Sequence, residues 1–85
     1  MRKYRWVKAD NGTIVLKQYR ERKHDWGKVY SYWVPLANVY RATRGTRYVL
    51  EIYLGNAKVQ RHATHSLREA MRLCKMLVIL ENRNG

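Results

Sequence analysis

The fold is decided by residues 48–80, which read YVLEIYLGNAKVQRHATHSLREAMRLCKMLVIL. Residues 48–54 are rich in β-branched and aromatic side chains, a composition typical of a strand. The Gly55-Asn56 pair that follows favours a tight turn. Residues 58–63 then predict a returning strand, so the first half of this stretch reads as a β-hairpin.

The second half of the stretch predicts a helix over residues 66–81. Ser66 and Glu69 have the spacing of a capping box, in which each side chain accepts a hydrogen bond from the other residue's backbone amide. Apolar residues then recur at helical spacing and form one face. They are Leu67, Ala70, Met71, Cys74, Leu77 and Val78.

The preceding residues predict further strands. Asn11-Gly12 is typical of a two-residue turn, because both residues tolerate a positive φ, and it centres a hairpin over residues 4–19. Residues 29–34 predict another strand. We expect Pro35 to end that strand or to place it at a sheet edge, because proline has no N–H for the ladder. Residues 36–40 fit either a helical turn or a continued strand.

Residues 20–28 and 41–47 are polar and basic, and we expect both to be connections. The elements together predict a single α+β domain over residues 1–85. In this domain a small antiparallel sheet of about four or five strands packs one face against the C-terminal helix.

The charge of the chain indicates a polyanionic partner. Its 85 residues hold 18 Lys and Arg against 6 Asp and Glu, a formal charge of +12. With 46% hydrophobic residues the chain has the apolar surface that disordered basic tails lack. Binding to a phosphate backbone would relieve the repulsion among these like charges in a folded domain. We therefore expect nucleic acid as the partner, with DNA favoured over RNA.

Aromatic residues sharpen this expectation. Strand alternation puts Tyr30 and Tyr32 on one face and Trp33 on the other, and we expect Trp6 or Trp33 to anchor the core. The remaining tyrosines, exposed beside arginines, would form a platform for bases. The predicted nucleic-acid contacts are Arg20, Arg22, Lys23, Arg41, Arg44, Arg47, Tyr53, Lys58 and Arg61.

The sequence lacks the residues that disulfides, zinc sites and most catalytic sites require. Cys74 is the single cysteine, so a disulfide within the chain and a cysteine-rich zinc site are excluded, and we expect it in the core. We expect no cofactor, no metal and no catalysis. A metal-free ribonuclease that uses His24 or His62 stays an alternative. No apolar run approaches the ~20 residues of a membrane helix, and no signal peptide is evident, so we expect a cytoplasmic protein without membrane contact.

Two partner questions stay open. Leu73, Met76 and Leu80 form a second apolar stripe on the predicted helix, which fits either a wide core face or a homodimer contact. The basic face could also serve an inhibitor of phage type, which binds an acidic or nucleic-acid-binding surface of a host protein.

Residues 46–80 resemble the arm-type DNA-binding domains of phage and transposon integrases. The resemblance rests on the strand at residues 48–54, the Gly55-Asn56-Ala57-Lys58 turn, the return strand and the helix opening at Thr64-His65-Ser66. It implies a three-stranded sheet, braced by one helix, whose free face enters the major groove. The groove-facing candidates would be Arg47, Glu51, Tyr53, Lys58, Gln60 and His62. The N-terminal hairpin departs from that pattern. The small chain fits an accessory or regulatory factor of phage or mobile-element type.

Overall fold

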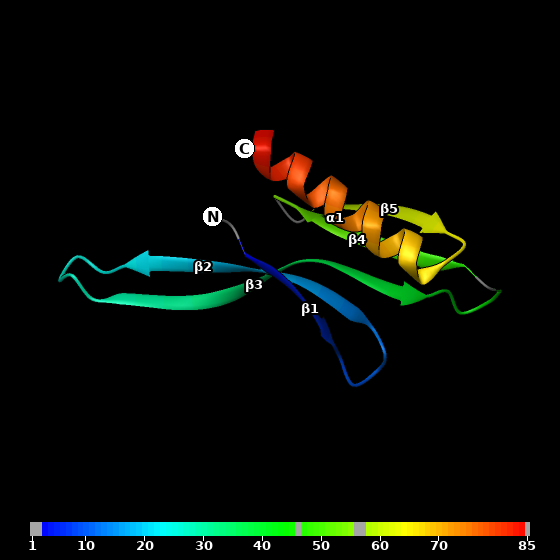
Figure 1. Cartoon of the computed structure of the whole chain (residues 1–85), viewed down its shortest axis with the longest axis horizontal. Coiled ribbons are helices and arrows are strands. Elements are labelled where there is room, and N and C mark those ends of the chain that lie inside the picture. Colours follow the sequence, from blue (N-terminus) through cyan, green and yellow to red (C-terminus); the bar gives the residue numbers. More distant parts are fainter. Residues whose placement is uncertain (1–2, 46, 56–57, 85) are drawn as a thin grey trace.

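A computed structural model of the chain shows five antiparallel strands in sequence order and one C-terminal helix (Figure 1). It describes residues 3–45, 47–55 and 58–84, with the backbone alone for residues 82–84. The elements are β1 (Tyr4–Lys8), β2 (Ile14–Lys23), β3 (Val29–Arg41), β4 (Tyr48–Leu54), β5 (Lys58–Thr64) and α1 (Leu67–Asn84). The predicted α+β fold is confirmed. Asn56, in the predicted turn after β4, lies outside the described residues.

The turn between β1 and β2 has three residues, so the predicted two-residue turn is wrong. The Ala9 amide donates to the Thr13 carbonyl at 2.8 Å, which leaves residues 10–12 as the loop. Gly12 has a φ of 87°, and the Asn11 side chain accepts a hydrogen bond from the Thr13 amide at 3.0 Å. A glycine in the left-handed region closes three-residue hairpin loops in this way.

Of the two predicted roles for Pro35, the edge position is the one found, because strand β3 continues past this proline to Arg41. Lys17 pairs with Pro35 and Leu16 pairs with Ala37, so Leu36 is an extra residue in a bulge. Among the described residues, pairing with β4 begins only at Ala37. Pro35 therefore lies where β3 has β2 as its one neighbour, and there its missing N–H costs no ladder bond.

Beyond this bulge β2 and β3 form a two-stranded projection, which we call the arm and define as residues 20–32 (Figure 1). The sequence interpretation of residues 20–28 as a connection is wrong for residues 20–23, which belong to β2. The turn is residues 24–28, where the His24 amide donates to the Lys28 carbonyl at 2.8 Å. The tip of the arm lies at one end of the long axis of the molecule, which measures 53 Å.

Helix α1 lies on one face of the sheet and contacts β3, β4 and β5. Ser66 caps it, because the Glu69 amide donates to the Ser66 hydroxyl at 3.1 Å. The helix runs to Asn84, so the predicted end at residue 81 was too early. The buried apolar core consists of Leu16, Ala37, Val39, Leu50, Ile52, Ala70, Cys74 and Val78.

The two tryptophans that were expected in the core lie on opposite faces of the sheet. Trp6 packs against the core from β1. Trp33 pairs with Tyr19 in the register, which puts it on the sheet face away from α1. Trp33 is therefore a surface residue of the site described below, and the expectation of a core role holds for Trp6 alone.

We expect Leu50→Ala to lower the free energy of unfolding by about 2–5 kcal/mol, because a fully buried side chain leaves a cavity between sheet and helix. Urea denaturation measures this loss. The control is Val59→Ala on the neighbouring strand, where the side chain is 45% exposed. Equal losses in the two variants would contradict the assigned core.

Burial raises the pKa of the Cys74 thiol from its ordinary 9.0 to about 11. We expect the native protein to resist a thiol reagent at about pH 8 and to react once urea exposes the thiol. The unfolded thiol ionises first, so this group favours the fold fully below pH 9.0 and loses that effect as pH rises toward about 11. Cys74→Ala should show a smaller loss of stability over that window, and an identical pH profile would contradict the burial effect.

Candidate nucleic-acid interface

The strand register divides the side chains of the sheet between a face under α1 and a face that α1 leaves uncovered. Tyr53 pairs with Val59, and Arg5 pairs with Lys17, so these residues share the uncovered side. We call this side the open face. Its strand residues include Arg5, Val7, Val15, Lys17, Tyr19, Trp33, Asn38, Tyr40, Val49, Glu51, Tyr53, Val59, Arg61 and Ala63.

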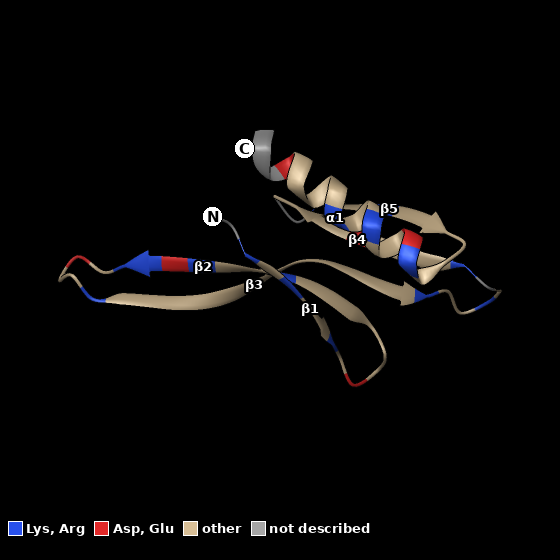
Figure 2. Ribbon diagram, in the orientation of Figure 1, with Lys and Arg blue, Asp and Glu red and all other residues tan. Residues whose placement is uncertain are grey.

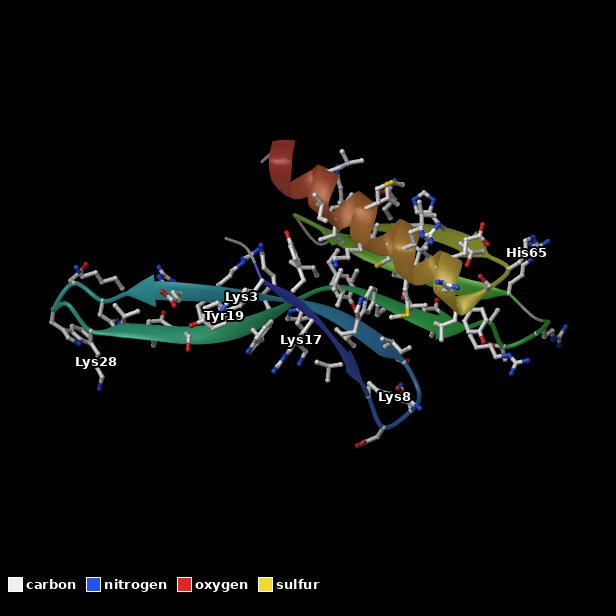
Figure 3. All side chains as sticks on the ribbon, in the orientation of Figure 1. Lys3, Lys8, Lys17, Tyr19, Lys28 and His65 are labelled. Carbon is white, nitrogen blue, oxygen red and sulfur yellow. The ribbon has the colours of Figure 1, made fainter. Side chains whose placement is uncertain are left out.

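At the base of the arm, cations lie over the rings of the open face. The Arg5 guanidinium lies 4.0 Å from the centre of the Trp33 ring, and Lys3 Nζ lies 6.0 Å from the centre of the Tyr19 ring. Tyr19 meets Trp33 edge-on, with ring centres 5.4 Å apart. Figure 3 shows Lys3 beside Tyr19 near the start of β1. Cation–π attraction holds these charges in place, and the cations cover part of the ring faces.

The other face of the arm carries a row of stacked rings, which we call the ring ladder: Trp26, His24, Tyr30 and Tyr32. The Trp26 and His24 ring centres lie 4.4 Å apart at an interplanar angle of 7°. His24 lies 4.6 Å from Tyr30, and Tyr30 lies 5.8 Å from Tyr32. Each tyrosine is 38% exposed and Trp26 is 74% exposed. The ladder is thus a set of flat surfaces that water still reaches.

Two predicted contact arginines lie beside the ring ladder. The register pairs Arg22 with Tyr30 and Arg20 with Tyr32, and Arg20 Nε donates to Gln18 at 3.0 Å. Lys23 points to the opposite side of β2, with Tyr19 and Glu21, by strand alternation. The arm therefore presents basic side chains on both faces and exposed rings on one.

The second predicted arginine cluster lies far from the first. Arg41 ends β3, and Arg44 and Arg47 are exposed in the loop that follows. Figures 1 and 2 show this loop at the opposite end of the long axis from the tip of the arm. The structure does not bring the two clusters together, so they cannot hold the same phosphate.

The predicted contacts on β4 and β5 divide between the faces. Tyr53 lies on the open face, where its hydroxyl oxygen accepts a hydrogen bond from Asn38 Nδ2 at 2.6 Å. Arg61 lies there too and forms an ion pair with Glu51. The hydrogen bond to Glu51 raises the pKa of Arg61. Because a carboxylate already holds this guanidinium, Arg61 is less available to a phosphate than the arginines of the arm.

The expectation that Lys58, Gln60 and His62 share the face of Tyr53 is wrong. They pair with Leu54, Ile52 and Leu50, so they point to the helix side. His62 Nε2 is buried there and has no hydrogen-bond partner among the described residues. His24 lies in the ring ladder on the arm, so the two histidines of the ribonuclease alternative belong to separate regions.

The sequence interpretation missed Lys3, Arg5 and Lys17 at the base of the arm, and missed the ring ladder. Two signals could have found them. Arg20 and Arg22 are spaced two residues apart, as side chains on one face of a strand are. The Trp26-Gly27 pair indicates a turn, and Gly27 has a φ of 90°. Extending the strand through residue 23 would have placed both arginines opposite the tyrosines.

No protein family, curated protein or solved structure matches this chain. Among residues 3–45, 47–55 and 58–84, no helix is long and apolar enough to cross a bilayer. The same residues contain no group of three or more His, Cys, Asp or Glu side chains placed to hold a metal ion. The assignment of function therefore rests on the arm, the open face and the loop described above.

Proposed function

We propose that this protein binds nucleic acid, double-stranded DNA in preference to RNA, with the arm as its principal contact. The observation that supports this most is the combination found on the arm. Exposed rings lie beside Arg20 and Arg22 on one face, and cation-covered rings lie at its base on the other. We also propose, with the integrase resemblance as support, a role as an accessory or regulatory factor of phage or mobile-element type.

The shape of the arm favours DNA. A two-stranded β-ribbon fits the major groove of B-form DNA, which is about 12 Å wide. The major groove of A-form RNA is too narrow for side chains to read. An arm that extends beyond the helix-covered part of the sheet reaches a groove without hindrance from α1.

Most cations of the arm and the loop are available to phosphates. Among the described residues the one ion pair joins Arg61 to Glu51. Arg22, Lys23, Arg44 and Arg47 are exposed. Each cation that neutralises a phosphate releases counterions, and this makes binding steeply dependent on salt.

The loop arginines extend the contact along the duplex. The molecule is 53 Å long, which corresponds to about 16 base pairs at ~3.4 Å per pair. A duplex that lies lengthwise on the protein would therefore meet the arm at one end and Arg44 and Arg47 at the other. These arginines would position the duplex through phosphates, while the arm supplies the contacts to bases.

We further propose that a second copy of this chain covers the exposed stripe of α1. Met76 is 52% exposed and Leu80 46% exposed, and Leu73 lies at the margin of the core. The stripe forms a groove lined by Arg72, Lys75, Met76, Ile79 and Leu80. The helix from residue 67 to 81 has three basic and two acidic residues, so it carries less net charge than the arm or the loop after β3, and a second copy of this +12 protein meets less repulsion here than at either of them.

The arm and the loop should each contribute to the salt dependence of DNA binding. In mobility-shift titrations, Arg22→Ala/Lys23→Ala and Arg44→Ala/Arg47→Ala should each weaken binding and flatten the slope of log K against log salt by about two. The matched control is Arg68→Ala/Lys75→Ala on α1, which removes the same charge and should leave the slope nearly unchanged.

The slopes separate the alternatives. An unchanged slope for the loop variant would place Arg44 and Arg47 away from the ligand. If all three variants lose affinity equally, the charge acts without a site and the proposed interface is wrong. If neither duplex nor single-stranded DNA or RNA binds at about 50 mM salt, nucleic acid is not the ligand.

For the helix stripe, we expect Met76→Glu/Leu80→Glu to convert a dimer into a monomer, because an ionised carboxylate is not tolerated in an apolar contact. Sedimentation equilibrium measures the mass, and circular dichroism checks that the helix is retained. Arg68→Glu reverses a charge at an exposed position of α1 outside this groove and should leave the dimer intact. A monomeric parent protein at its highest soluble concentration would contradict the proposal.

A further inference from the structure

Trp26 stands at the tip of the arm with 74% of its surface exposed. Its indole lies flat on the His24 ring, 4.4 Å away and nearly parallel. Among the described residues, no second ring and no cation contacts the indole. One face of Trp26 is therefore supported by the protein, and the other faces solvent at the extreme end of the molecule.

The stability of the arm gives no sufficient reason for a tryptophan at this position. Tyr30 packs on His24 and on Tyr32, and these rings supply the contacts along the strands. The side chain of Trp26 is mostly in water, so its burial adds little. Tryptophan combines a large apolar ring with one polar N–H and is enriched at interfaces for that reason.

The turn presents Trp26 in a defined position. The His24 amide bonds the Lys28 carbonyl at 2.8 Å, and the Gly27 amide bonds the His24 carbonyl at 2.9 Å. Gly27 takes a φ of 90°, which lets the chain reverse immediately after the tryptophan. The ring is thus held on a closed turn by its own backbone bonds and by the stack on His24.

We infer that Trp26 inserts between base pairs at a poorly stacked step of duplex DNA, which makes distorted duplexes the preferred ligand class. This inference deepens the proposed function and depends on it. The exposed indole face can take a base in the same way that its other face takes the His24 ring. Apolar side chains act as wedges of this kind when a protein unstacks and kinks a duplex.

The energetics favour a defect over an intact duplex. Opening a base step costs a few kcal/mol in an intact duplex and least where the base is mismatched or unpaired. Stacking a base on an aromatic side chain is worth about 1–3 kcal/mol, so at an intact step the cost of opening and the gain from stacking nearly cancel. At a bulge or mismatch the gain remains, and the tip prefers that site.

Charges at the tip fit the same placement. Lys28 lies at the end of the arm (Figure 3), and Lys23 pairs with Val29 just behind it. These cations are placed to bind backbone phosphates beside the inserted ring. Asp25, next to Trp26 in the turn, repels phosphate, so the two cations set how the tip approaches the backbone.

The test compares three ligands of one sequence by fluorescence anisotropy: an intact duplex, the same duplex with a single-base bulge, and the single strand. We expect the parent protein to bind the bulged duplex most tightly. Trp26→Ala should weaken that complex by about fivefold to 140-fold, which is the stacking range converted at 1.4 kcal/mol per tenfold, and should weaken binding to the intact duplex much less. Trp26→Phe should retain part of the preference, and Arg68→Ala, at an exposed position of α1 away from the arm, should leave it unchanged.

A second readout reports insertion directly. With 2-aminopurine beside the bulge, the parent protein should raise its fluorescence by unstacking it, and Trp26→Ala should not. Equal binding of the bulged and intact duplexes, an equal loss on both in Trp26→Ala, or tightest binding to the single strand would overturn the inference while the proposed function stands. Loss of binding to all three ligands in the parent protein would overturn the proposed function itself.

Discussion

Strand β3 has two different surroundings along its length, and the rest of the molecule depends on this. From Ala37 to Val39 it lies between β2 and β4, and Ala37 and Val39 are buried beneath α1. From Val29 to Pro35 it pairs with β2 alone. The change occurs at the bulge around Leu36, next to a proline that cannot bond a strand on its far side. Bulges increase local twist and bend the strand, so the arm leaves the plane of the sheet at this point (Figure 1).

An isolated two-stranded ribbon is marginal in water, so the arm needs contacts beyond its ladder bonds. They come from both faces. Arg5 and Tyr19 meet Trp33 at the base, and the ring ladder runs along the other side toward the tip. The residues that stabilise the arm are therefore also the rings and cations of the candidate interface. Trp26, at the end of the ladder that lies at the tip, stacks on His24 with one ring face and is 74% exposed.

The core, the two basic ends of the molecule and the helix differ in charge. The core under α1 is apolar, and burial there raises the pKa of its one thiol, Cys74. The arm and the loop after β3 are basic and lie at opposite ends of the molecule. The helix is close to balanced and carries the exposed apolar stripe. A polyanion along the sheet and a second copy at the helix would thus use separate surfaces.

Local signals in the sequence predicted the strands, the capped helix and the α+β class, because strand composition, the Ser66 cap and helical periodicity act within a few residues of one another. They also identified most of the basic residues of the arm and the loop. These local signals did not predict the pairing register, and the register sets the face of every strand residue. It moved Lys58 and His62 to the helix side, put Trp33 under Arg5 instead of in the core, and placed Arg22 beside Tyr30. Composition alone determined that this chain is a basic, aromatic, folded protein. Only the tertiary structure decided which rings meet which cations, because those contacts join residues far apart in the chain.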